Sequence, residues 1–303
     1  MTQTREQVQR WPAWHAWLLA ARPATLPASA SGVVVGIGAA LAGGAPIRLV
    51  AALLCLAVAV LLQVAANFAN DLSDFRRGAD RPDRLGPTRV VAGGLIGAGE
   101  VERGIAAVLV AAGLVGVALA VIGGPLILVV GASAVVATLA YTGGPWPYGY
   151  HALGEPFVFV YFGLVAVIGT AYLQTGRVEG LYVVAALPVG TLIAAILVVN
   201  NLRDIATDRA AGKRTLAVIL GPTATRIELA ALVSVAYLVP PALATTRGPA
   251  VLLPLVTLPL AVPVARAVAR DVDPSRLNPV LGATARLTLF YSLAFAAGLA
   301  LSR

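Results

Sequence analysis

Nine long apolar runs divide this sequence, and they constrain the fold more than any other feature. They are bounded by charged residues, Gly or Pro, and fall at about 24–42, 49–70, 104–122, 126–142, 156–173, 181–200, 227–245, 250–269 and 284–301. Most approach the roughly 20 residues that a helix needs to cross the hydrocarbon core of a membrane. They are too long for barrel strands and lack two-residue alternation. We therefore expect an all-α, polytopic membrane protein with nine transmembrane helices.

The composition supports this expectation and excludes two other classes of chain. Hydrophobic residues make up 59% of the 303 residues and charged residues 12%, against about 25% charged in a soluble domain; the mean hydropathy is +0.86. A water-soluble enzyme needs more charge than this, and a disordered chain needs low hydrophobicity with high charge. We expect a single integral membrane domain over residues 1–303. Residues 1–22 are expected to form a cytoplasmic, interfacial segment, because Trp11, Trp14 and Trp17 share one helical face.

The basic residues predict the orientation of the helices. With the N-terminus in the cytoplasm, nine spans place 18 of the 22 Lys and Arg residues on the cytoplasmic side and leave only Arg48, Arg177, Arg247 and Arg303 outside. Cytoplasmic loops of membrane proteins are enriched in Lys and Arg. The net charge of +8 is then explained by the basic residues of the cytoplasmic loops. We therefore expect no nucleic-acid partner.

Two polar segments interrupt the hydrophobic pattern, each at the cytoplasmic end of an even-numbered span. The first is Asn67-Phe-Ala-Asn70-Asp71-Leu-Ser-Asp74, and the second is Asn200-Asn-Leu-Arg-Asp204-Ile-Ala-Thr-Asp208. On a helix, residues four apart are neighbours, so the Asn and Asp side chains of each segment can project from one face. Asp74 and Asp204 are 130 residues apart, which suggests two four-helix units followed by a ninth helix.

Helix termination and charge neutralisation would explain either segment alone, but two matching segments at one membrane face favour a binding site. Mg²⁺ prefers oxygen ligands and usually joins one or two carboxylates to the oxygens of a substrate phosphate. Basic residues flank both segments and could hold the remaining phosphate charge; they include Arg76, Arg77, Lys213 and Arg214. The pattern therefore predicts an Mg²⁺–diphosphate site above a hydrophobic cavity.

Other phosphate and metal motifs do not fit this sequence. Gly212-Lys213 precedes Arg214 rather than Ser or Thr, and Thr207 stands where a P-loop has its first glycine. The chain has two His and one Cys, too few for a zinc site. A P-loop nucleotide site and a zinc enzyme are therefore excluded.

The chain resembles the UbiA superfamily of intramembrane prenyltransferases, and within it the MenA type, which prenylates 1,4-dihydroxy-2-naphthoate. The resemblance covers nearly the whole chain. It rests on the nine-helix layout, the two Asp-rich segments, and further motifs at Ala21–Pro27 (ARPATLP), Arg84–Arg89 (RLGPTR), Tyr141–Tyr150 (YTGGPWPYGY), Gly154-Glu155 and Gly212–Leu216 (GKRTL).

Two positions differ from the wider superfamily. Many relatives have a third aspartate where this chain has Gly78, with Asp80 as the nearest acid. Relatives that prenylate hydroxybenzoate tend to have a lysine shortly after the tyrosine that matches Tyr141, where this chain has Gly-Gly-Pro. The first difference leaves the number of metal ions open, and the second favours the naphthoate branch.

The resemblance implies a reaction, a cofactor and a location. A polyprenyl diphosphate would lose diphosphate, and 1,4-dihydroxy-2-naphthoate would take the prenyl group with loss of CO₂. The product would be the demethylmenaquinol of menaquinone synthesis. Mg²⁺ is the implied cofactor, with two ions expected and Mn²⁺ able to substitute. The implied location is the bacterial inner membrane, with the lipid bilayer as a partner and the site on the cytoplasmic side.

The resemblance also assigns roles to residues of this chain. The implied metal ligands are Asn70, Asp71 and Asp74 for one ion and Asp204 and Asp208 for a second. The implied diphosphate ligands are Asn67, Asn70, Asn201, Arg84, Arg89 and Lys213. The residues expected at the acceptor are Arg22, Tyr150 and Glu155, and Tyr141 and Tyr150 would face the allylic cation, since an aromatic ring attracts a cation. The residues expected to act in catalysis are Asp71, Asp74, Tyr141, Asp204, Asp208 and Lys213.

Alternatives remain for single residues and for the function. Tyr150 could be an interfacial anchor, Glu155 could pair with a loop arginine, and Arg22 could serve only to anchor the cytoplasmic end. Within the family, the alternative acceptor is hydroxybenzoate or homogentisate. Outside it, the alternative is a secondary transporter for an organic anion, but transporters place such charges near the bilayer midplane, whereas the acids here gather at one edge.

Overall fold

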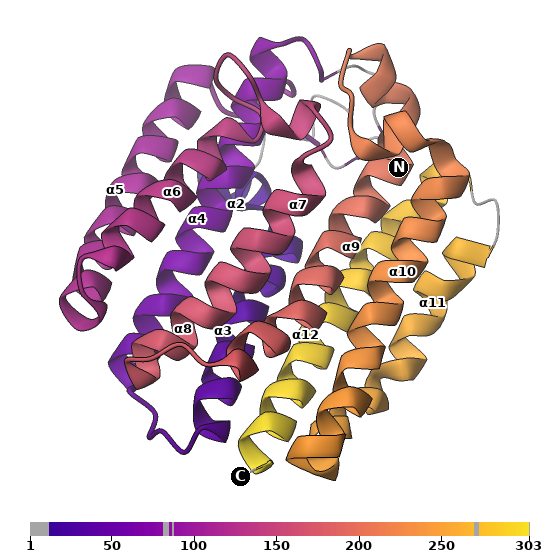
Figure 1. Cartoon of the computed structure of the whole chain (residues 1–303). Coiled ribbons are helices and arrows are strands. Elements are labelled where there is room, and N and C mark those ends of the chain that lie inside the picture. Colours follow the sequence, from indigo (N-terminus) through magenta and orange to yellow (C-terminus); the bar gives the residue numbers. More distant parts are fainter. Residues whose placement is uncertain (1–11, 81–84, 87, 270–272, 303) are drawn as a thin grey trace.

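The computed structural model describes residues 12–80, 85–86, 88–269 and 273–302, and these residues form helices and connecting loops without a strand. Figure 1 shows the long helices side by side, with α5 and α6 on one flank and α10 and α11 on the other. The elements in chain order are α2 (Ala13–Ala21), η1 (Pro23–Thr25), α3 (Leu26–Ala42), α4 (Leu49–Arg76), α5 (Ala98–Gly123), α6 (Leu126–Ala140), η2 (Tyr148–Tyr150), α7 (Gly154–Val158), η3 (Phe159–Val165), α8 (Ala166–Thr175), α9 (Gly180–Ala210), α10 (Leu216–Arg247), η4 (Pro249–Thr257), α11 (Leu258–Ala269), η5 (Pro274–Arg276) and α12 (Leu277–Leu301).

Eight helical stretches in the described part of the chain are long and apolar enough to cross a membrane. They are α2–α3, α4, α5, α7–α8, α9, α10, η4–α11 and η5–α12, and the shorter apolar helix α6 makes the ninth. These nine helices coincide with the nine apolar runs of the sequence. The prediction of an all-α, nine-helix membrane fold is therefore confirmed.

Three spans depart from the predicted boundaries or regularity. The seventh begins at Leu216 rather than near residue 227, and it is kinked at Gly221, where φ is 79°. Glycine tolerates this left-handed conformation because it lacks a Cβ, and Pro222 can follow because it suits the first turn of the resumed helix. The fifth span contains a π-helical segment, η3, and the ninth begins at η5 instead of residue 284.

The helix α9 is the most buried of the candidate spans, and α3 packs closely on its neighbours. A Cβ atom at Gly32 would lie 2.5 Å from the Phe162 carbonyl oxygen, and one at Gly36 would lie 2.6 Å from the Val167 carbonyl oxygen. Only glycine permits such an approach of α3 to η3 and α8. Gly32 and Gly36 thus form a GxxxG pair at which α3 contacts η3 and α8.

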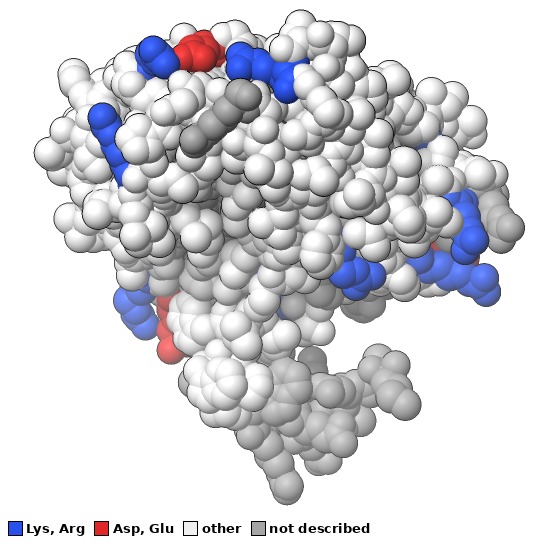
Figure 2. Space-filling model, turned by 90° about the horizontal axis from the view of Figure 1, so that it is seen from below, with Lys and Arg blue, Asp and Glu red and all other residues white. Residues whose placement is uncertain are grey.

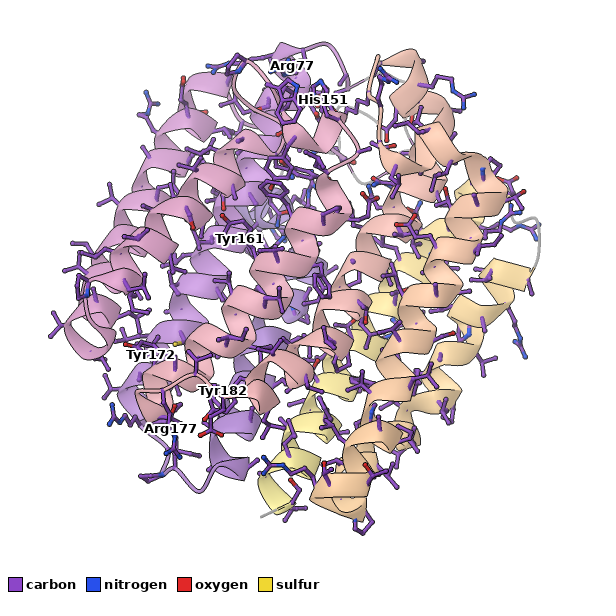
Figure 3. The ribbon with its side chains drawn as sticks, viewed as in Figure 1. Arg77, His151, Tyr161, Tyr172, Arg177 and Tyr182 are labelled. Atoms are coloured by element: carbon purple, nitrogen blue, oxygen red, sulfur yellow. The ribbon has the colours of Figure 1, made fainter. Side chains whose placement is uncertain are left out.

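Both polar segments continue their helices beyond the apolar runs, since α4 extends to Arg76 and α9 to Ala210. Figure 3 places Arg77, at the end of α4, and His151 at one end of the bundle, with Arg177 at the opposite end. In Figure 2, which looks from below at that opposite end, uncharged side chains cover most of the surface and charged ones lie at its margin. The acidic segments and most neighbouring polar groups thus share one end.

The predicted interfacial segment is seen only in part, because Trp11 lies outside the described residues. Trp14 is 60% exposed, as an interfacial residue should be. The ring of Trp17 instead packs against Phe68, with ring centroids 5.3 Å apart, and a Cβ at Gly104 would meet it at 2.6 Å. The side chain of Trp17 therefore packs α2 against α4 and α5.

Candidate active site

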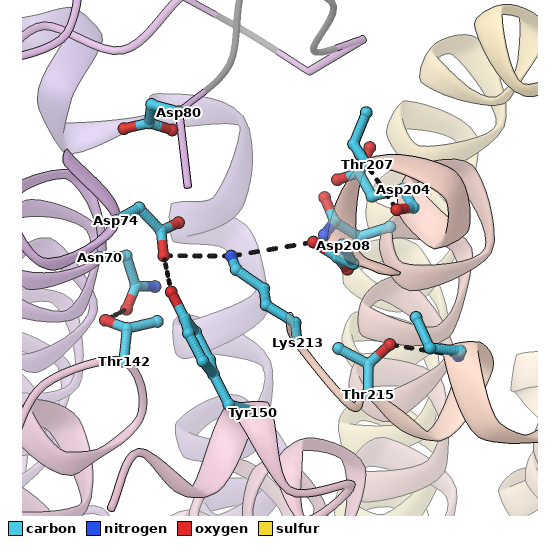
Figure 4. A network of polar contacts seen from close by, with 12 residues as sticks. Asn70, Asp74, Asp80, Thr142, Tyr150, Asp204, Thr207, Asp208, Lys213 and Thr215 are labelled. Atoms are coloured by element: carbon cyan, nitrogen blue, oxygen red, sulfur yellow. Dashed lines mark hydrogen bonds and ion pairs between the residues drawn. The ribbon is translucent and has the colours of Figure 1, made fainter. Parts of the chain in front are cut away.

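The helices α4 and α9 bring the two acidic segments to the same place, and Lys213 lies between them (Figure 4). The Lys213 Nζ atom is 3.1 Å from Asp74 Oδ1 and 3.8 Å from Asp208 Oδ1. Lys213 stands in the turn that follows α9, with Gly212 at a φ of 74° just before it. One ammonium group thus joins two motifs that are far apart in the sequence.

Asp74 is the centre of this network and is only 2% exposed. Besides Lys213, its carboxylate accepts a hydrogen bond from the Tyr150 hydroxyl at 2.7 Å and one from Arg89 Nη2 at 2.7 Å. Arg89 Nε also lies 3.3 Å from Asp80 Oδ1. The sequence alone did not decide whether Asp80 belongs to the site. The structure includes it in the network through its ion pair with Arg89.

Tyr150 lies at the acidic end of the site. Lys213 Nζ is 4.8 Å from the centre of its ring and the Arg77 guanidinium carbon 5.5 Å. Burial, and then the charge of Asp74, raise the pKa of Tyr150 well above its usual value, so its hydroxyl remains a hydrogen-bond donor. The structure thus places Tyr150 with Asp74 and Lys213, beside the two acidic motifs.

The loop that carries Tyr150 is joined to the loop that carries Lys213. The backbone N–H of Arg214 donates to the Tyr150 carbonyl oxygen at 3.0 Å. Thr142, at the start of the first loop, donates from its hydroxyl to Asn70 Oδ1 at 2.9 Å. These two contacts fix the α6–α7 loop between the motif on α4 and the turn after α9.

Tyr141 directly follows α6 and faces the edge of Tyr148, with ring centroids 5.4 Å apart. Burial raises its pKa well above the ordinary value, and the charges of Glu155, Asp208 and Asp74 raise it further. Its ring therefore lies within the field of both acidic motifs and of Glu155. This position suits the predicted role of Tyr141 near a developing cation.

Asp204 is held by its neighbour Arg203, which sequence reasoning did not include in the site. Arg203 donates from Nε to Asp204 Oδ1 at 2.7 Å and from Nη2 to Asp204 Oδ2 at 2.6 Å. The same guanidinium donates to Asn278 Oδ1 at 2.7 Å and Asn200 Oδ1 at 2.8 Å. The buried Arg203 guanidinium therefore orients the Asp204 carboxylate and connects α9 to the first turn of α12.

Two residues predicted at the diphosphate, Asn67 and Asn201, form hydrogen bonds that join the acidic motifs to neighbouring segments. Asn67 donates to the Ala21 carbonyl oxygen at 2.8 Å and to Thr25 Oγ1 at 3.0 Å, and so holds the turn that contains Arg22. Asn201 donates to Glu155 Oε1 at 2.7 Å. The two amides therefore link the first acidic motif to the turn between α2 and η1 and the second to Glu155.

Three further predicted residues are located as follows. Asp71 accepts the Val90 backbone N–H on Oδ2 at 2.9 Å, which draws the segment around Arg89 onto α4. Arg22 ends α2 in a left-handed conformation with φ at 49°, a conformation in which helices commonly end. Arg84 lies outside the described residues.

The carboxylate and amide oxygens at this site are the type of ligand that Mg²⁺ prefers. Among the described residues, no group of three or more His, Cys, Asp and Glu side chains is arranged as a ready metal centre. Mg²⁺ does not require one, because it usually takes one or two carboxylates together with phosphate oxygens and water. Asp74 and Asp208 offer carboxylate oxygens from facing helices, and the cationic Lys213 lies between them in this structure.

The bundle of apolar helices defines an integral membrane protein. Its buried acidic and basic residues meet at one end and form a polar site suited to an anionic head group. The chain belongs to the UbiA prenyltransferase family, whose family model matches residues 31–299.

Curated relatives match nearly the whole chain. The 1,4-dihydroxy-2-naphthoate octaprenyltransferase of Mycobacterium tuberculosis is 42% identical over 94% of this chain and 96% of its own length. The enzyme of the same name from Escherichia coli is 37% identical over 99% of both chains. A solved UbiA homolog from Archaeoglobus fulgidus, bound to DMAPP and Mg²⁺, aligns with a TM-score of 0.64 at 18% identity over 92% of this chain and 98% of its own. That likeness shows a shared fold.

Proposed function

We propose that this protein transfers a polyprenyl group from a polyprenyl diphosphate to 1,4-dihydroxy-2-naphthoate, with release of diphosphate and CO₂. The observation that carries the proposal is the shared contact of Lys213 with Asp74 and Asp208 at the end of an apolar bundle. An amphiphile with a diphosphate head and a prenyl tail matches that combination of charge and apolar surface. Relatives at 37% and 42% identity bear the name of this activity.

The residues around Asp74 would bind and activate the diphosphate. Asn70, Asp74 and Asp208 would hold Mg²⁺, which neutralises diphosphate charge and favours departure of that group when bound. Lys213 and Arg89, already fixed by Asp74, would hold the negative charge that grows on the diphosphate as the C–O bond breaks. Such preorganised cations act most strongly where water is excluded.

The acceptor would lie between Tyr141, Glu155 and the Arg22 turn. Arg22 would attract its carboxylate, and Tyr141 would face the allylic cation. The ring carbon that bears the carboxylate would form the new C–C bond while the diphosphate takes the electron pair of the C–O bond. Loss of CO₂ then restores the aromatic ring, so the product is neutral and can leave into the bilayer.

An acceptor panel tests this function. Purified protein with Mg²⁺ and a polyprenyl diphosphate is expected to turn over 1,4-dihydroxy-2-naphthoate at least about tenfold more efficiently than 4-hydroxybenzoate or homogentisate. The physical reason is that 4-hydroxybenzoate lacks one of the two ring hydroxyls and leaves the contacts made to it unpaired, while both single-ring acceptors lack the second ring. The measurement is kcat/KM for each acceptor, with the product mass as identification. A preference for hydroxybenzoate, with its carboxylate retained, would make the naphthoate proposal wrong.

The site is proposed to face the cytoplasm across a bacterial inner membrane. In a Cys55→Ala background, Thr88→Cys and Ala211→Cys at the site end should react with membrane-impermeant thiol reagents only from the cytoplasmic face. Val178→Cys, which replaces a side chain 61% exposed at the opposite end, is the matched control and should react only from outside. The reverse pattern of labelling would contradict the orientation.

A further inference from the structure

Arg77 directly follows α4, three residues after Asp74, and its side chain reaches the α6–α7 loop (residues 141–153). Its Nε atom donates to the Thr142 carbonyl oxygen at 3.1 Å, and its Nη2 atom donates to the Gly144 carbonyl oxygen. The sequence alone places Arg77 among the basic residues that could hold phosphate charge. The structure instead directs two donors of its guanidinium to the backbone of the loop.

The preceding residue, Arg76, extends in a different direction. Its Nη2 atom lies 3.0 Å from Oε2 of Glu102 on α5, in an ion pair whose two side chains are both more than half exposed. Successive residues at the end of a helix point in directions about 100° apart, which explains why adjacent arginines find separate partners. Arg76 and Arg77 therefore connect the end of α4 to different segments.

Hydrogen bonds within the α6–α7 loop connect the part that Arg77 contacts to the part that carries Tyr150. The Gly149 N–H donates to the Tyr141 carbonyl oxygen at 2.9 Å, and the Tyr150 N–H donates to the Pro147 carbonyl oxygen at 2.9 Å. A Cβ at Gly149 would lie only 2.7 Å from the Tyr141 carbonyl oxygen, so the two ends of the loop approach each other closely. A loop closed in this way transmits a constraint at its start to Tyr150.

Tyr150 is placed where its hydroxyl acts on the first acidic motif. Figure 4 shows this hydroxyl directed at Asp74, and it donates to Asp74 Oδ1 at 2.7 Å. The same oxygen accepts from Lys213 Nζ at 3.1 Å, so the orientation of the carboxylate depends on both donors. The Arg77 guanidinium carbon lies 5.5 Å from the centre of the Tyr150 ring. Because an aromatic ring attracts a cation, Arg77 holds Tyr150 directly as well as through the loop backbone.

We propose that Arg77 is a positioning residue for the transfer reaction: it holds the α6–α7 loop against α4 and thereby keeps the Tyr150 hydroxyl on Asp74. The inference rests on the function proposed above, in which Asp74 holds Mg²⁺ at the diphosphate. Arg77 acts through Tyr150 and does not itself contact the diphosphate. Without its contacts the loop would open, and the Asp74 carboxylate would lose one of the donors that orient it.

A double-mutant cycle tests this sequence of contacts. Arg77 is exposed, so Arg77→Ala should fold normally. Arg77→Ala and Tyr150→Phe should each lower kcat/KM for the prenyl diphosphate by about tenfold, the scale of one hydrogen bond to a charged group. The double variant should stay within about twofold of Tyr150→Phe, because the hydroxyl that Arg77 positions is already absent. Arg77→Lys should recover only part of the loss, since lysine lacks the forked donor geometry of arginine.

Hydrogen exchange measures the position of the loop independently of catalysis. In Arg77→Ala, the loop amides of Tyr150 and Leu153, which donate to carbonyl oxygens of the loop, should exchange about tenfold faster than in the wild type, because local opening becomes less costly. Amides in the middle of α9 should keep their wild-type rates. Arg103→Ala, which removes an exposed arginine near the start of α5, is the matched control and should change neither exchange nor kcat/KM.

The outcomes separate the possible roles of Arg77. A further loss of similar size when Arg77→Ala is added to Tyr150→Phe would show that Arg77 acts on the substrate by itself, and the inference would be wrong. Unchanged exchange of the loop in Arg77→Ala, or faster exchange with wild-type kcat/KM, would contradict it as well. A wild-type protein that transfers no prenyl group would contradict the proposed function, while the exchange rates would still decide whether Arg77 holds the loop.

Discussion

Replacing Asp74 with asparagine is expected to lower kcat by about 10²-fold or more, the scale of losing one preorganised electrostatic group. Asp74 is the residue on which Lys213, Arg89 and Tyr150 converge, so the substitution weakens a metal ligand and disorders the cations that hold the diphosphate. The measurement is single-turnover kinetics at saturating Mg²⁺ with protein in lipid vesicles.

A second variant makes this result decisive if Asp74→Asn proves unstable. Asp208 is less buried, with 13% of its side chain exposed, and Asp208→Asn is expected to fold normally and to show a comparable loss. Glu102→Gln, which alters an exposed ion pair with Arg76, is the control at the same end of the bundle. Turnover within about threefold of wild type in both aspartate variants would contradict the metal and diphosphate assignment.

Replacing Lys213 with alanine is expected to lower kcat/KM for the prenyl diphosphate by about 10- to 100-fold, since a charge-assisted contact contributes about 1.5–3 kcal/mol. The acceptor KM should stay within about twofold of wild type, because Lys213 lies at the acidic end with Tyr150. Lys213→Arg should recover part of the loss, since it restores the charge with a different geometry. Initial rates with one substrate varied at a time measure these constants.

The matched control is Arg209→Gln. Arg209 is an exposed cation on the last turn of α9 whose guanidinium contacts the Val218 carbonyl oxygen, outside the Asp74 network. If Arg209→Gln lowered kcat/KM as much as Lys213→Ala, general positive charge at this end would account for the effect. If Lys213→Ala raised the acceptor KM instead, the placement of Lys213 at the diphosphate would be wrong.

The helices could be predicted from the sequence because each property that defines them is local. An apolar run of sufficient length specifies a membrane helix, and the four-residue spacing in Asn67–Asp74 places Asn and Asp on one face wherever the helix is packed. The kink at Gly221 and the π-helical segment η3 depend on how these helices meet. Apolar run length carries no information about such contacts.

The pairing of side chains within the site could not be predicted for the same reason. Lys213 and Asp74 are 139 positions apart, so only the tertiary fold shows that one ammonium group serves both motifs. Asn67 and Asn201 belong to motifs that suggest phosphate contacts, yet their amides turn to Ala21 and Glu155. Periodicity fixes the face of a helix that a residue occupies, whereas the neighbouring helices determine its partner.

One site residue that sequence reasoning missed, Arg203, did leave a signal. Arg203 directly precedes Asp204, and sequence reasoning counted it only among the cytoplasmic arginines, although a buried carboxylate next to an arginine is a natural partner for it.

The central claim is a prenyl transfer coupled to loss of the acceptor carboxylate, and carbon labelling tests it most directly. Purified protein in lipid vesicles is supplied with Mg²⁺, a polyprenyl diphosphate and 1,4-dihydroxy-2-naphthoate that carries ¹³C in its carboxylate. We expect one labelled CO₂ and one diphosphate for each prenylated product, with all three abolished by EDTA and restored by Mg²⁺. A prenylated product that retains the label, or full activity in EDTA, would contradict the account.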